Sequence, residues 1–267
     1  MKHPVITLLS DFGVHDHFVG AMKGVIAGIC PDAAVVDITH DLSPMAVGEA
    51  AFLLGCAYPY FPAGTVHLAV VDPGVGSRRR PLAARCGDHL FVGPDNGIMT
   101  YALADAAEWQ AVAITNPQCR LNDVSATFHG RDVFAPAAAH LAAGMSLEAL
   151  GPAVKDPVLL DLPTPRETGR GLEAHVLHVD RFGNLITDLK REHLARWLGG
   201  EDPQGVIIEA GQGSLRGIKD CYEAVAEGRL LALIGSAGRL EIAVNCGRAS
   251  DRLALTQGNS ILLRKGS

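Results

Sequence analysis

The sequence predicts an α/β domain followed by a smaller, mostly β domain. In the first half of the chain, strand-like and helix-like segments alternate; a proline-rich stretch follows, and strand patterns dominate after it. Strands that alternate with helices pair in parallel, so we expect an N-terminal α/β domain with a mostly parallel central sheet. The C-terminal domain, of about a hundred residues, is expected to be all-β and barrel-like.

Apolar residues at helical spacing predict helices over residues 19–29 and 47–61, and a further helix in the alanine-rich stretch after His129. Pro31 ends the first of these helices. Short apolar and β-branched runs predict strands over residues 4–11, 33–39, 65–72, 82–86, 90–92 and 111–114.

Proline and turn-forming residues mark the domain boundary. We therefore expect an α/β domain over residues 1–155, a linker over 156–171 and a β domain over 172–267. Strands in the β domain are predicted over residues 173–180, 184–189, 205–210, 230–235, 239–244 and 260–265.

Composition narrows the classes of partner. The chain of 267 residues is 48% hydrophobic but only 5% aromatic, with a net charge of −6, which argues against nucleic acid as a partner. No apolar stretch reaches the roughly 20 residues of a membrane span, and no signal peptide is visible. The six cysteines contain no Cys-x-x-Cys pair, so we expect reduced thiols and a cytoplasmic location.

Three polar clusters fall where predicted parallel strands end, the usual place for ligands in such sheets: residues 10–13, 71–80 and 127–132. Taken singly, Asp11 is as much a helix cap or turn former as a functional carboxylate. Asp72 could likewise serve only a turn, and His129 could be an ordinary histidine. Their shared position at one sheet edge favours a functional site.

Phosphate and metal chemistry are weakly supported. The glycine-rich segment 74–79 lacks the lysine of a nucleotide-binding loop, and Arg79 stands where a third glycine would be needed. Asp11, His15, Asp16 and His17 could gather around a divalent ion, but exposed loop polarity is the favoured interpretation. We therefore expect no metal and no cofactor.

Seven segments, in order, resemble one known family: LLSDFGVHDHFVGAMKGVI, VVDITHDLSP, VVDPGVGSRRR, VGPDNGI, TFHGRDVFAP, VDRFGNLITD and SAGRLEIAVNCG. They are similar to the S-adenosylmethionine hydroxide adenosyltransferases, relatives of the enzymes that make 5′-fluoro- and 5′-chloro-adenosine. The resemblance covers nearly the whole chain, from about residue 6 to residue 250.

The resemblance implies a hydrolase that cleaves S-adenosyl-L-methionine at the ribose C5′ with water, giving adenosine and L-methionine without a metal. It also implies an α/β domain, a β-barrel-like domain, and a homotrimer. In such a trimer the active sites lie where the first domain of one subunit meets the second domain of a neighbour.

The family's water-handling residues fall on Asp72, Arg79 and His129, although Arg78 and Arg80 leave the choice of arginine open. The substrate-binding set implied by the resemblance is spread over both domains: Asp11 for the ribose hydroxyls, Gly130 beside His129, Asp180 for the methionine ammonium, Phe182 and Asn184 for adenine, Ser236 for the methionine carboxylate, and Val244, Asn245 and Cys246 for the adenine edge.

Two alternatives remain open at this point. A halogenase is disfavoured because a carboxylate such as Asp72 would repel a halide. A sensor that binds adenosine or S-adenosylmethionine without chemistry is disfavoured because a binder needs no water-activating group.

Overall fold

The computed structural model describes residues 3–266, which divide into two compact units, Met1–Leu160 and Asp161–Ser267. The division falls inside the stretch 156–171 predicted as a linker. Within that stretch, strand β7 (Arg166–Thr168) pairs with β8 (Gly171–Val179), so part of it is built into the sheet of the second unit. Each unit is described by itself.

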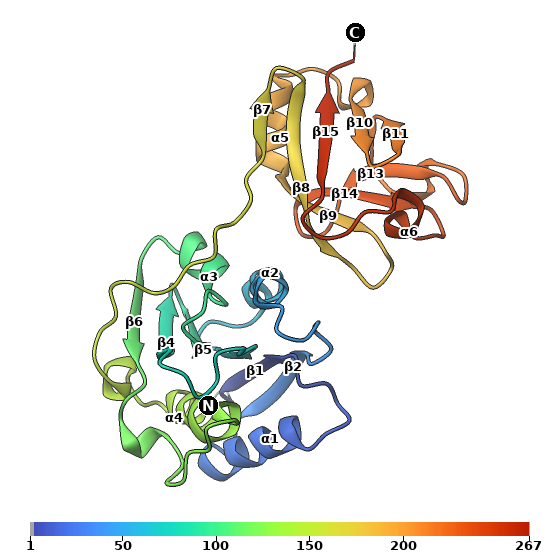
Figure 1. Cartoon of the computed structure of the whole chain (residues 1–267). Coiled ribbons are helices and arrows are strands. Elements are labelled where there is room, and N and C mark those ends of the chain that lie inside the picture. The colour runs from blue at the N-terminus through green and yellow to red at the C-terminus, as the bar shows by residue number, and fades with distance from the viewer. Residues whose placement is uncertain (1–2, 267) are drawn as a thin grey trace. The chain divides into compact units, whose positions relative to one another are not determined.

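The first unit is built on one mixed, six-stranded sheet (Figure 1). Its order is β2-β1-β3-β5-β4-β6, and the strands β2, β1, β3 and β5 pair in parallel. Strand β4 is antiparallel to both of its neighbours. The strands are β1 (Val5–Ser10), β2 (Ala34–Thr39), β3 (Val66–Val70), β4 (Pro81–Cys86), β5 (His89–Pro94) and β6 (Trp109–Ala113).

The sheet is thus mostly parallel, as predicted, and β4 is the strand that runs against the other five. Only Gly87 and Asp88 connect β4 to β5, and Gly87 has a φ of +54°. A two-residue connection makes a hairpin, whereas a parallel crossover needs a dozen residues or more. The carboxyl end of β3, the start of β4 and the end of β5 consequently meet at one edge of the sheet.

Helices cover both faces of this sheet. Helices α1 (Phe18–Ile29) and α4 (Ala135–Ala142) pack on one face, and α2 (Val47–Ala57) and α3 (Thr100–Asp105) pack on the other. Side chains of successive strand residues alternate between the two faces, as a pleated strand requires. Leu8 belongs to the core under α1, and Leu9 to the core under α2.

The helix predicted over residues 47–61 is shorter than expected. It ends at Ala57 and continues as a 3₁₀ turn, η1 (Tyr58–Tyr60), because Pro59 has no N–H to continue the α-helical ladder. Shorter turns complete the first unit: η2 (Pro117–Cys119), the π-helical turn η3 (Gly130–Phe134) and η4 (Leu147–Leu150).

The second unit is a nine-stranded sheet that curls back on itself. Its path runs β11-β10-β15-β8-β9-β14-β13-β12, with β7 added on β8, and only β12 and β13 pair in parallel. The two end strands of this path are neighbours in sequence, separated by Gly217 alone, so the sheet is nearly barrel-shaped. The remaining strands are β9 (Leu185–Lys190), β10 (Ile207–Ala210), β11 (Gly213–Arg216), β12 (Ile218–Lys219), β13 (Leu230–Ile234), β14 (Arg239–Val244) and β15 (Ser260–Arg264).

This unit is not purely β, in contrast to the sequence prediction. Two short helices, α5 (Arg191–Leu198) and α6 (Ala249–Leu253), pack on the sheet, and the turns η5 (Pro203–Gly205) and η6 (Tyr222–Ala224) connect strands. Helix α5 places Leu194 and Leu198 in the core, at the i and i+4 spacing of one helix face.

A buried histidine of the first sheet contacts a second, half-buried one. The side chain of His67 on β3 is fully buried; its Nδ1 is 2.8 Å from Thr7 Oγ1, and its Nε2 is 3.2 Å from Nδ1 of His89. Burial, and secondarily His89, lower the pKa of His67 from 6.5 to about 3. The folded protein therefore keeps this histidine neutral under conditions in which the unfolded chain protonates it.

We expect the free energy of unfolding to fall as the pH falls below 6.5, because the unfolded chain then binds a proton that the native state excludes. The slope from this one group is about 1.4 kcal/mol per pH unit until the pH approaches the native pKa. Urea unfolding at several pH values measures it. His67→Gln should show a shallower slope than the wild type, whereas His15→Gln, at an exposed position, should not. Equal slopes in all three proteins would contradict the assignment.

Candidate active site

A pocket of about 350 Å³ opens at the carboxyl edge of the first sheet. Strands β1 and β3 are parallel, with Ser10 opposite Val70, so the segments that carry Asp11 and Asp72 leave the sheet side by side. Four of the predicted site residues line this pocket: Asp11, Asp72, His129 and Gly130.

Arg79 joins Asp72 to His129. Its Nε donates to both carboxylate oxygens of Asp72, at 2.9 and 3.0 Å, and its Nη2 forms a further short contact with Asp72 Oδ2. The same Nη2 lies 2.7 Å from Nδ1 of His129. The side chains of Asp72 and Arg79 are only 6% and 10% exposed, so this ion pair is screened little by solvent. The structure therefore brings the three predicted water-handling residues together.

Its contact with Arg79 fixes the tautomer of His129. A guanidinium can only donate, so Nδ1 of His129 accepts, and the neutral imidazole carries its hydrogen on Nε2. Burial, followed by the positive charge of Arg79, lowers the pKa of His129, while Asp72 and Asp132 oppose this shift. At neutral pH, His129 is therefore an uncharged side chain with an N–H on Nε2.

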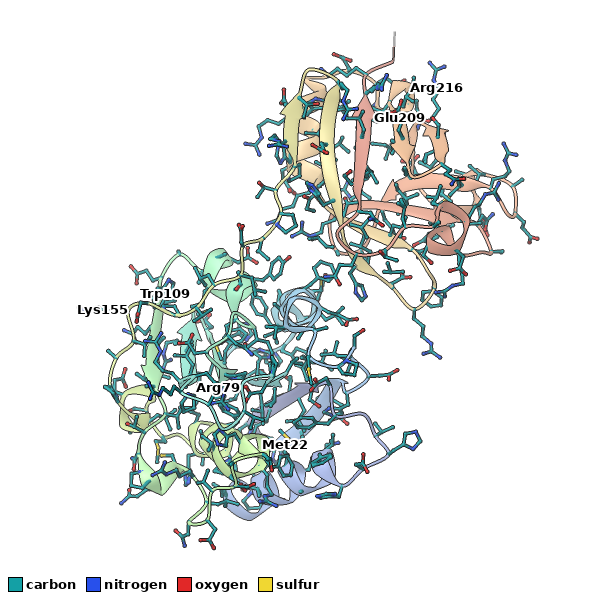
Figure 2. The ribbon with its side chains drawn as sticks, in the orientation of Figure 1. Met22, Arg79, Trp109, Lys155, Glu209 and Arg216 are labelled. Atoms are coloured by element: carbon teal, nitrogen blue, oxygen red, sulfur yellow. The ribbon has the colours of Figure 1, made fainter. Side chains whose placement is uncertain are left out.

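The structure also separates the three arginines of the loop. Arg79 lies in the first unit (Figure 2). Its guanidinium is 5.0 Å from the ring centre of Phe134, within the range of a cation–π contact. Arg80 pairs instead with Asp95 and Asp156, and Arg78 is exposed. Of the three, Arg79 is the arginine that contacts Asp72 and His129.

Two glycines let the loops approach closely. Gly76 has a φ of +75°, and a Cβ atom there would collide with the backbone carbonyl of Ala126, three residues before His129. A Cβ atom on Gly130 would lie 3.2 Å from Met22 Sδ and 3.3 Å from the ring of Phe12. Gly76 thus brings the arginine loop against the segment that carries His129.

Asp11 is oriented by a neighbouring backbone amide. Its Oδ2 accepts a hydrogen bond of 2.8 Å from the N–H of Met45, a residue held at a φ of +65°. This leaves Oδ1 to face a ligand. Beside it, the rings of Phe12, Phe18 and Phe128 form one aromatic cluster that lines the pocket, with centroids 5.0 to 5.9 Å apart. The pocket therefore offers one carboxylate beside an apolar wall.

The predicted residues of the second unit lie along the β9–β14 pair. In the β8–β9 turn, Asp180 accepts from the backbone N–H of Asn184 at 2.8 Å and from its Nδ2 at 3.0 Å. Leu185, which follows Asn184, is opposite Ile242 on β14, so this turn adjoins Val244 at the end of β14. The side chain of Phe182 is 73% exposed at the tip of the turn.

Ser236 lies at the opposite end of β14, in the turn between β13 and β14. Arg239 and Val244, which bound the strand, are about 17 Å apart at the usual rise per residue. Between these ends lies the buried carboxyl of Glu241, which accepts a 2.6 Å hydrogen bond from Tyr222. Burial raises the pKa of Glu241, Tyr222 opposes this shift, and the charge of Asp180 adds to it.

Internal hydrogen bonds hold Asn245, the residue after β14. The backbone N–H of Asn245 donates to Arg229, its carbonyl accepts from Gly228, and its side chain donates to Val225. Asn245, Val244 and the exposed Cys246, which has a φ of +56°, stay predicted contacts for the adenine edge.

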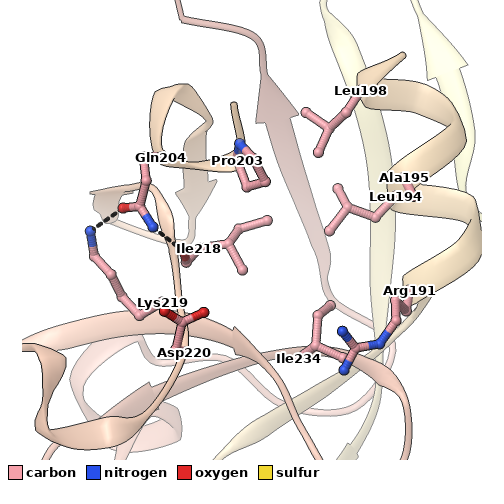
Figure 3. A pocket seen from close by; sticks show the side chains of 10 residues that line it. All are labelled: Arg191, Leu194, Ala195, Leu198, Pro203, Gln204, Ile218, Lys219, Asp220 and Ile234. Atoms are coloured by element: carbon pink, nitrogen blue, oxygen red, sulfur yellow. Dashed lines mark hydrogen bonds between the residues drawn. The ribbon is translucent and has the colours of Figure 1, made fainter. Parts of the chain in front are cut away.

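A second pocket, of about 430 Å³, holds none of the predicted residues (Figure 3). It lies between α5 and β12, where Gln204 bridges Lys219 and the carbonyl of Ile218, each at 2.7 Å. Across residues 3–266 no three His, Cys, Asp or Glu side chains are grouped as a metal site. No helix in the same range is long and apolar enough to cross a membrane.

The two units match the two domains of one protein family. A model described as the SAM hydroxide adenosyltransferase N-terminal domain matches residues 6–151, and the C-terminal domain of the same family matches residues 174–262. The fold and pocket thus define a two-domain adenosyltransferase-like protein. The chain belongs to the SAM hydroxide adenosyltransferase family.

Curated relatives agree with this membership. The chain is 43% identical to a protein of Salinispora tropica named (R)-S-adenosyl-L-methionine hydrolase, with 98% of each chain covered. A protein of the same name from Thermus thermophilus is also 43% identical, over 97% of this chain and 98% of the relative. A fluorinase of an Actinoplanes species is 28% identical over 73% of this chain and 74% of its own length.

Solved structures share the fold. An uncharacterized conserved protein from Thermotoga maritima is 35% identical, with a TM-score of 0.92 over 97% of this chain and all of that chain. A conserved hypothetical protein from Thermus thermophilus is 42% identical, with a TM-score of 0.79 over 98% of this chain and all of that one.

Sequence reasoning missed several residues of the pocket. Phe12, Phe18 and Phe128 are ordinary core residues by composition, although Phe12 and Phe128 adjoin Asp11 and His129 in the quoted segments. Met45 contributes through its backbone N–H, which no side-chain pattern can indicate.

Gly76→Ala is expected to push the arginine loop away from Ala126, because the new Cβ atom meets a backbone carbonyl. As Arg79 withdraws, the pKa of His129 should move toward 6.5, as followed by NMR titration of its ring protons. Gly64→Ala is the matched control: φ is +86°, and nothing lies within 4 Å of the added atom. Both variants should lose about 1 kcal/mol of stability from the left-handed backbone. An unchanged pKa of His129 in Gly76→Ala would contradict the role of Gly76 in bringing the arginine loop against the His129 segment.

Proposed function

We propose that this protein hydrolyses S-adenosyl-L-methionine at the ribose C5′, giving adenosine and L-methionine. The hydrolase names of relatives that are 42–43% identical over nearly the full chain support this activity. The observation that carries the chemistry is the Asp72–Arg79–His129 cluster, which shares one pocket with Asp11.

The reaction is a displacement at carbon. The oxygen of water forms a bond to C5′ as the C5′–S bond breaks, and its electron pair leaves on sulfur to give a neutral thioether. One proton of the water must be removed. The sulfonium leaves readily, whereas water, with a pKa of about 15.7, is a poor nucleophile. The protein therefore has to orient the water opposite the sulfur and accept its proton.

The tautomer of His129 divides these tasks. Its Nε2–H donates to the water oxygen and orients a lone pair toward C5′. Asp72 is then the acceptor: Arg79 occupies part of its lone-pair capacity, and one position on Oδ1 remains. The guanidinium stabilises the hydroxide character that develops as the proton leaves.

Burial strengthens this arrangement. Attack by an oxygen of growing negative charge on a sulfonium removes both charges, and a pocket of low polarity favours such a step. The ring cluster of Phe12, Phe18 and Phe128 supplies an apolar wall beside the acid–base residues. Asp11 would accept the ribose hydroxyls through Oδ1, with Met45 holding its other oxygen.

The methionine and adenine contacts are proposed for the second domain. Asp180 would face the ammonium group, and its oxygens each retain a lone pair beyond the bonds to Asn184. Phe182 offers an exposed ring for adenine, and Ser236 a hydroxyl for the methionine carboxylate.

Three further features belong to the proposal. The protein would act without a metal or cofactor, since Asp72 and Arg79 supply the charges that a metal-bound hydroxide would otherwise require. It would form a homotrimer, in which sites combine the first domain of one subunit with the second domain of another. It would work in the cytoplasm, which the six free cysteines support.

Purified protein should convert S-adenosyl-L-methionine to adenosine and methionine in the presence of a chelator. Water labelled with ¹⁸O should leave its oxygen on the 5′-hydroxyl, as read by mass spectrometry. Asp72→Asn and His129→Phe should each lower kcat by roughly 100-fold or more. Arg79→Lys should also lose activity, because it removes the bonds to Asp72 and His129. Its matched control, Arg78→Lys, changes an exposed arginine and should retain activity.

Formation of 5′-chloroadenosine in high chloride would favour a halogenase over this proposal. Tight adenosine binding without turnover would favour a sensor. A metal requirement that persists through chelation controls would overturn the metal-free chemistry.

As the pH falls, kcat/KM should begin to decrease only below pH 6.5, because His129 must stay neutral. Burial and Arg79 lower the pKa of His129, so the neutral, active form persists as the pH falls through 6.5 and is lost only near the lowered pKa. Protonation of Nδ1 then replaces the bond from Arg79 with repulsion between two cations. A pH profile measures this decrease, and Arg79→Lys should shift it. A decrease that begins above pH 6.5 would contradict the assignment.

A further inference from the structure

The turn that follows β5, residues 95–97, contacts the residues on both sides of the Asp72–Arg79 pair. Nδ2 of Asn96 donates a 2.8 Å hydrogen bond to the carbonyl of Val71, the residue before Asp72. Val71 is fully buried and lies one residue beyond the end of β3. The ladder of backbone hydrogen bonds in β3 ends at Val70. The Asn96 side chain supplies the next bond, to Val71.

Asp95, the residue before Asn96, binds Arg80 on the other side of the Asp72–Arg79 pair. The backbone N–H of Asp95 donates to the carbonyl of Arg80 at 3.0 Å, and its Oδ2 accepts from Nε of Arg80 at 2.7 Å. Arg80 directly follows Arg79, and the side chain of Asp95 is only 2% exposed. Two adjacent residues therefore fasten the backbone neighbours of Asp72 and Arg79.

The turn itself is held in place by several contacts. Oδ1 of Asn96 accepts from the N–H of Ile98 at 3.2 Å, and the hydroxyl of Thr100 donates to the carbonyl of Gly97 at 2.6 Å. Gly97 has a φ of +96°, and a Cβ atom there would lie 2.7 Å from the side chain of Leu160.

The end of the first unit covers this turn. Oδ1 of Asp95 accepts from the N–H of Val158 at 2.8 Å, and the guanidinium of Arg80 bonds both the carboxylate and the carbonyl of Asp156. A buried carboxylate with these partners has little freedom to move. The turn is therefore a rigid support and not a flexible loop end.

We propose that Asn96 and Asp95 are positioning residues that set the Asp72–Arg79 pair in the geometry needed to orient the attacking water. The proposal rests on the hydrolase function proposed above. Asp72 and Arg79 stand at the two ends of one loop, and a three-bond contact between their side chains needs both ends fixed to within a fraction of an ångström. Neither Asn96 nor Asp95 lines the pocket, so both act through Val71 and Arg80, the chain neighbours of the pair.

Asn96→Asp tests the role with a minimal change. It keeps an acceptor for Ile98 but replaces the donor to Val71 with a carboxylate oxygen, which repels that carbonyl. Asn116 is a matched control: its Nδ2 donates to the carbonyl of Ala149 at 2.8 Å, and its Oδ1 accepts from the N–H of Gln118 at 3.0 Å. Asn116→Asp therefore removes the same kind of bond away from the pocket.

In Asn96→Asp, kcat should fall by about 10- to 100-fold, while KM for S-adenosyl-L-methionine changes by less than about threefold. Asn116→Asp should keep kcat within about twofold of the wild type. Equal losses in the two variants, or an unchanged kcat in Asn96→Asp, would overturn the proposal.

A second readout does not depend on turnover. The Nε–H of Arg79, assigned by its loss in Arg79→Lys, gives an NMR signal that reports its bond to Asp72. This signal should shift and exchange faster with water in Asn96→Asp but not in Asn116→Asp; an unchanged signal would refute positioning. If the wild type fails to hydrolyse the substrate, the proposed function falls while this signal still decides the positioning role.

A second variant covers the case in which Asn96→Asp does not fold. Asp95→Asn keeps an oxygen for Val158 but weakens the grip on Arg80, and should move the Arg79 signal in the same direction. An unmoved signal there would also count against the proposal.

Discussion

The site depends on one property of arginine: its guanidinium donates hydrogen bonds and accepts none. Placed between Asp72 and His129, Arg79 donates to the carboxylate and obliges the histidine to accept through Nδ1. The hydrogen of the imidazole is thereby placed on Nε2. One side chain thus holds the carboxylate in place and sets the tautomer of the histidine, where little solvent competes for these hydrogen bonds.

The antiparallel direction of β4 allows Arg79 to contact Asp72 and His129. A parallel β4 would begin at the far edge of the sheet, and the loop from β3 would have to cross the molecule. Because β4 runs antiparallel, the loop over residues 71–80 leaves β3 and enters β4 at the same edge. The short hairpin at Gly87 returns the chain, so that β5 also ends there and brings Asn96 against Val71. The proposed positioning turn and the cluster it serves follow from the same topology.

The second unit shows a different arrangement. Its predicted residues are placed by strand register: the β8–β9 turn with Asp180 and Asn184 adjoins one end of β14, and the turn with Ser236 lies at the other. Internal hydrogen bonds already engage Asp180, Asn184 and Asn245. Much of what looks like ligand chemistry in this sequence therefore also maintains the turns themselves, and the groups left over are the second lone pairs and the exposed ring of Phe182.

The sequence by itself determined the order of the elements, because hydrophobic periodicity and proline positions act locally. It also determined the family, because seven segments resemble those of the family in the same order. Strand ends in the pattern already pointed to Asp72 and His129, but their water-handling role and the choice of Arg79 came only through that resemblance, with Arg78 and Arg80 as rivals. The tertiary structure decided which arginine reaches the carboxylate, which nitrogen of His129 carries the hydrogen, and that β4 is antiparallel. These are properties of contacts between residues far apart in the chain, and local patterns carry no information on the direction in which a side chain or strand finally meets its partner.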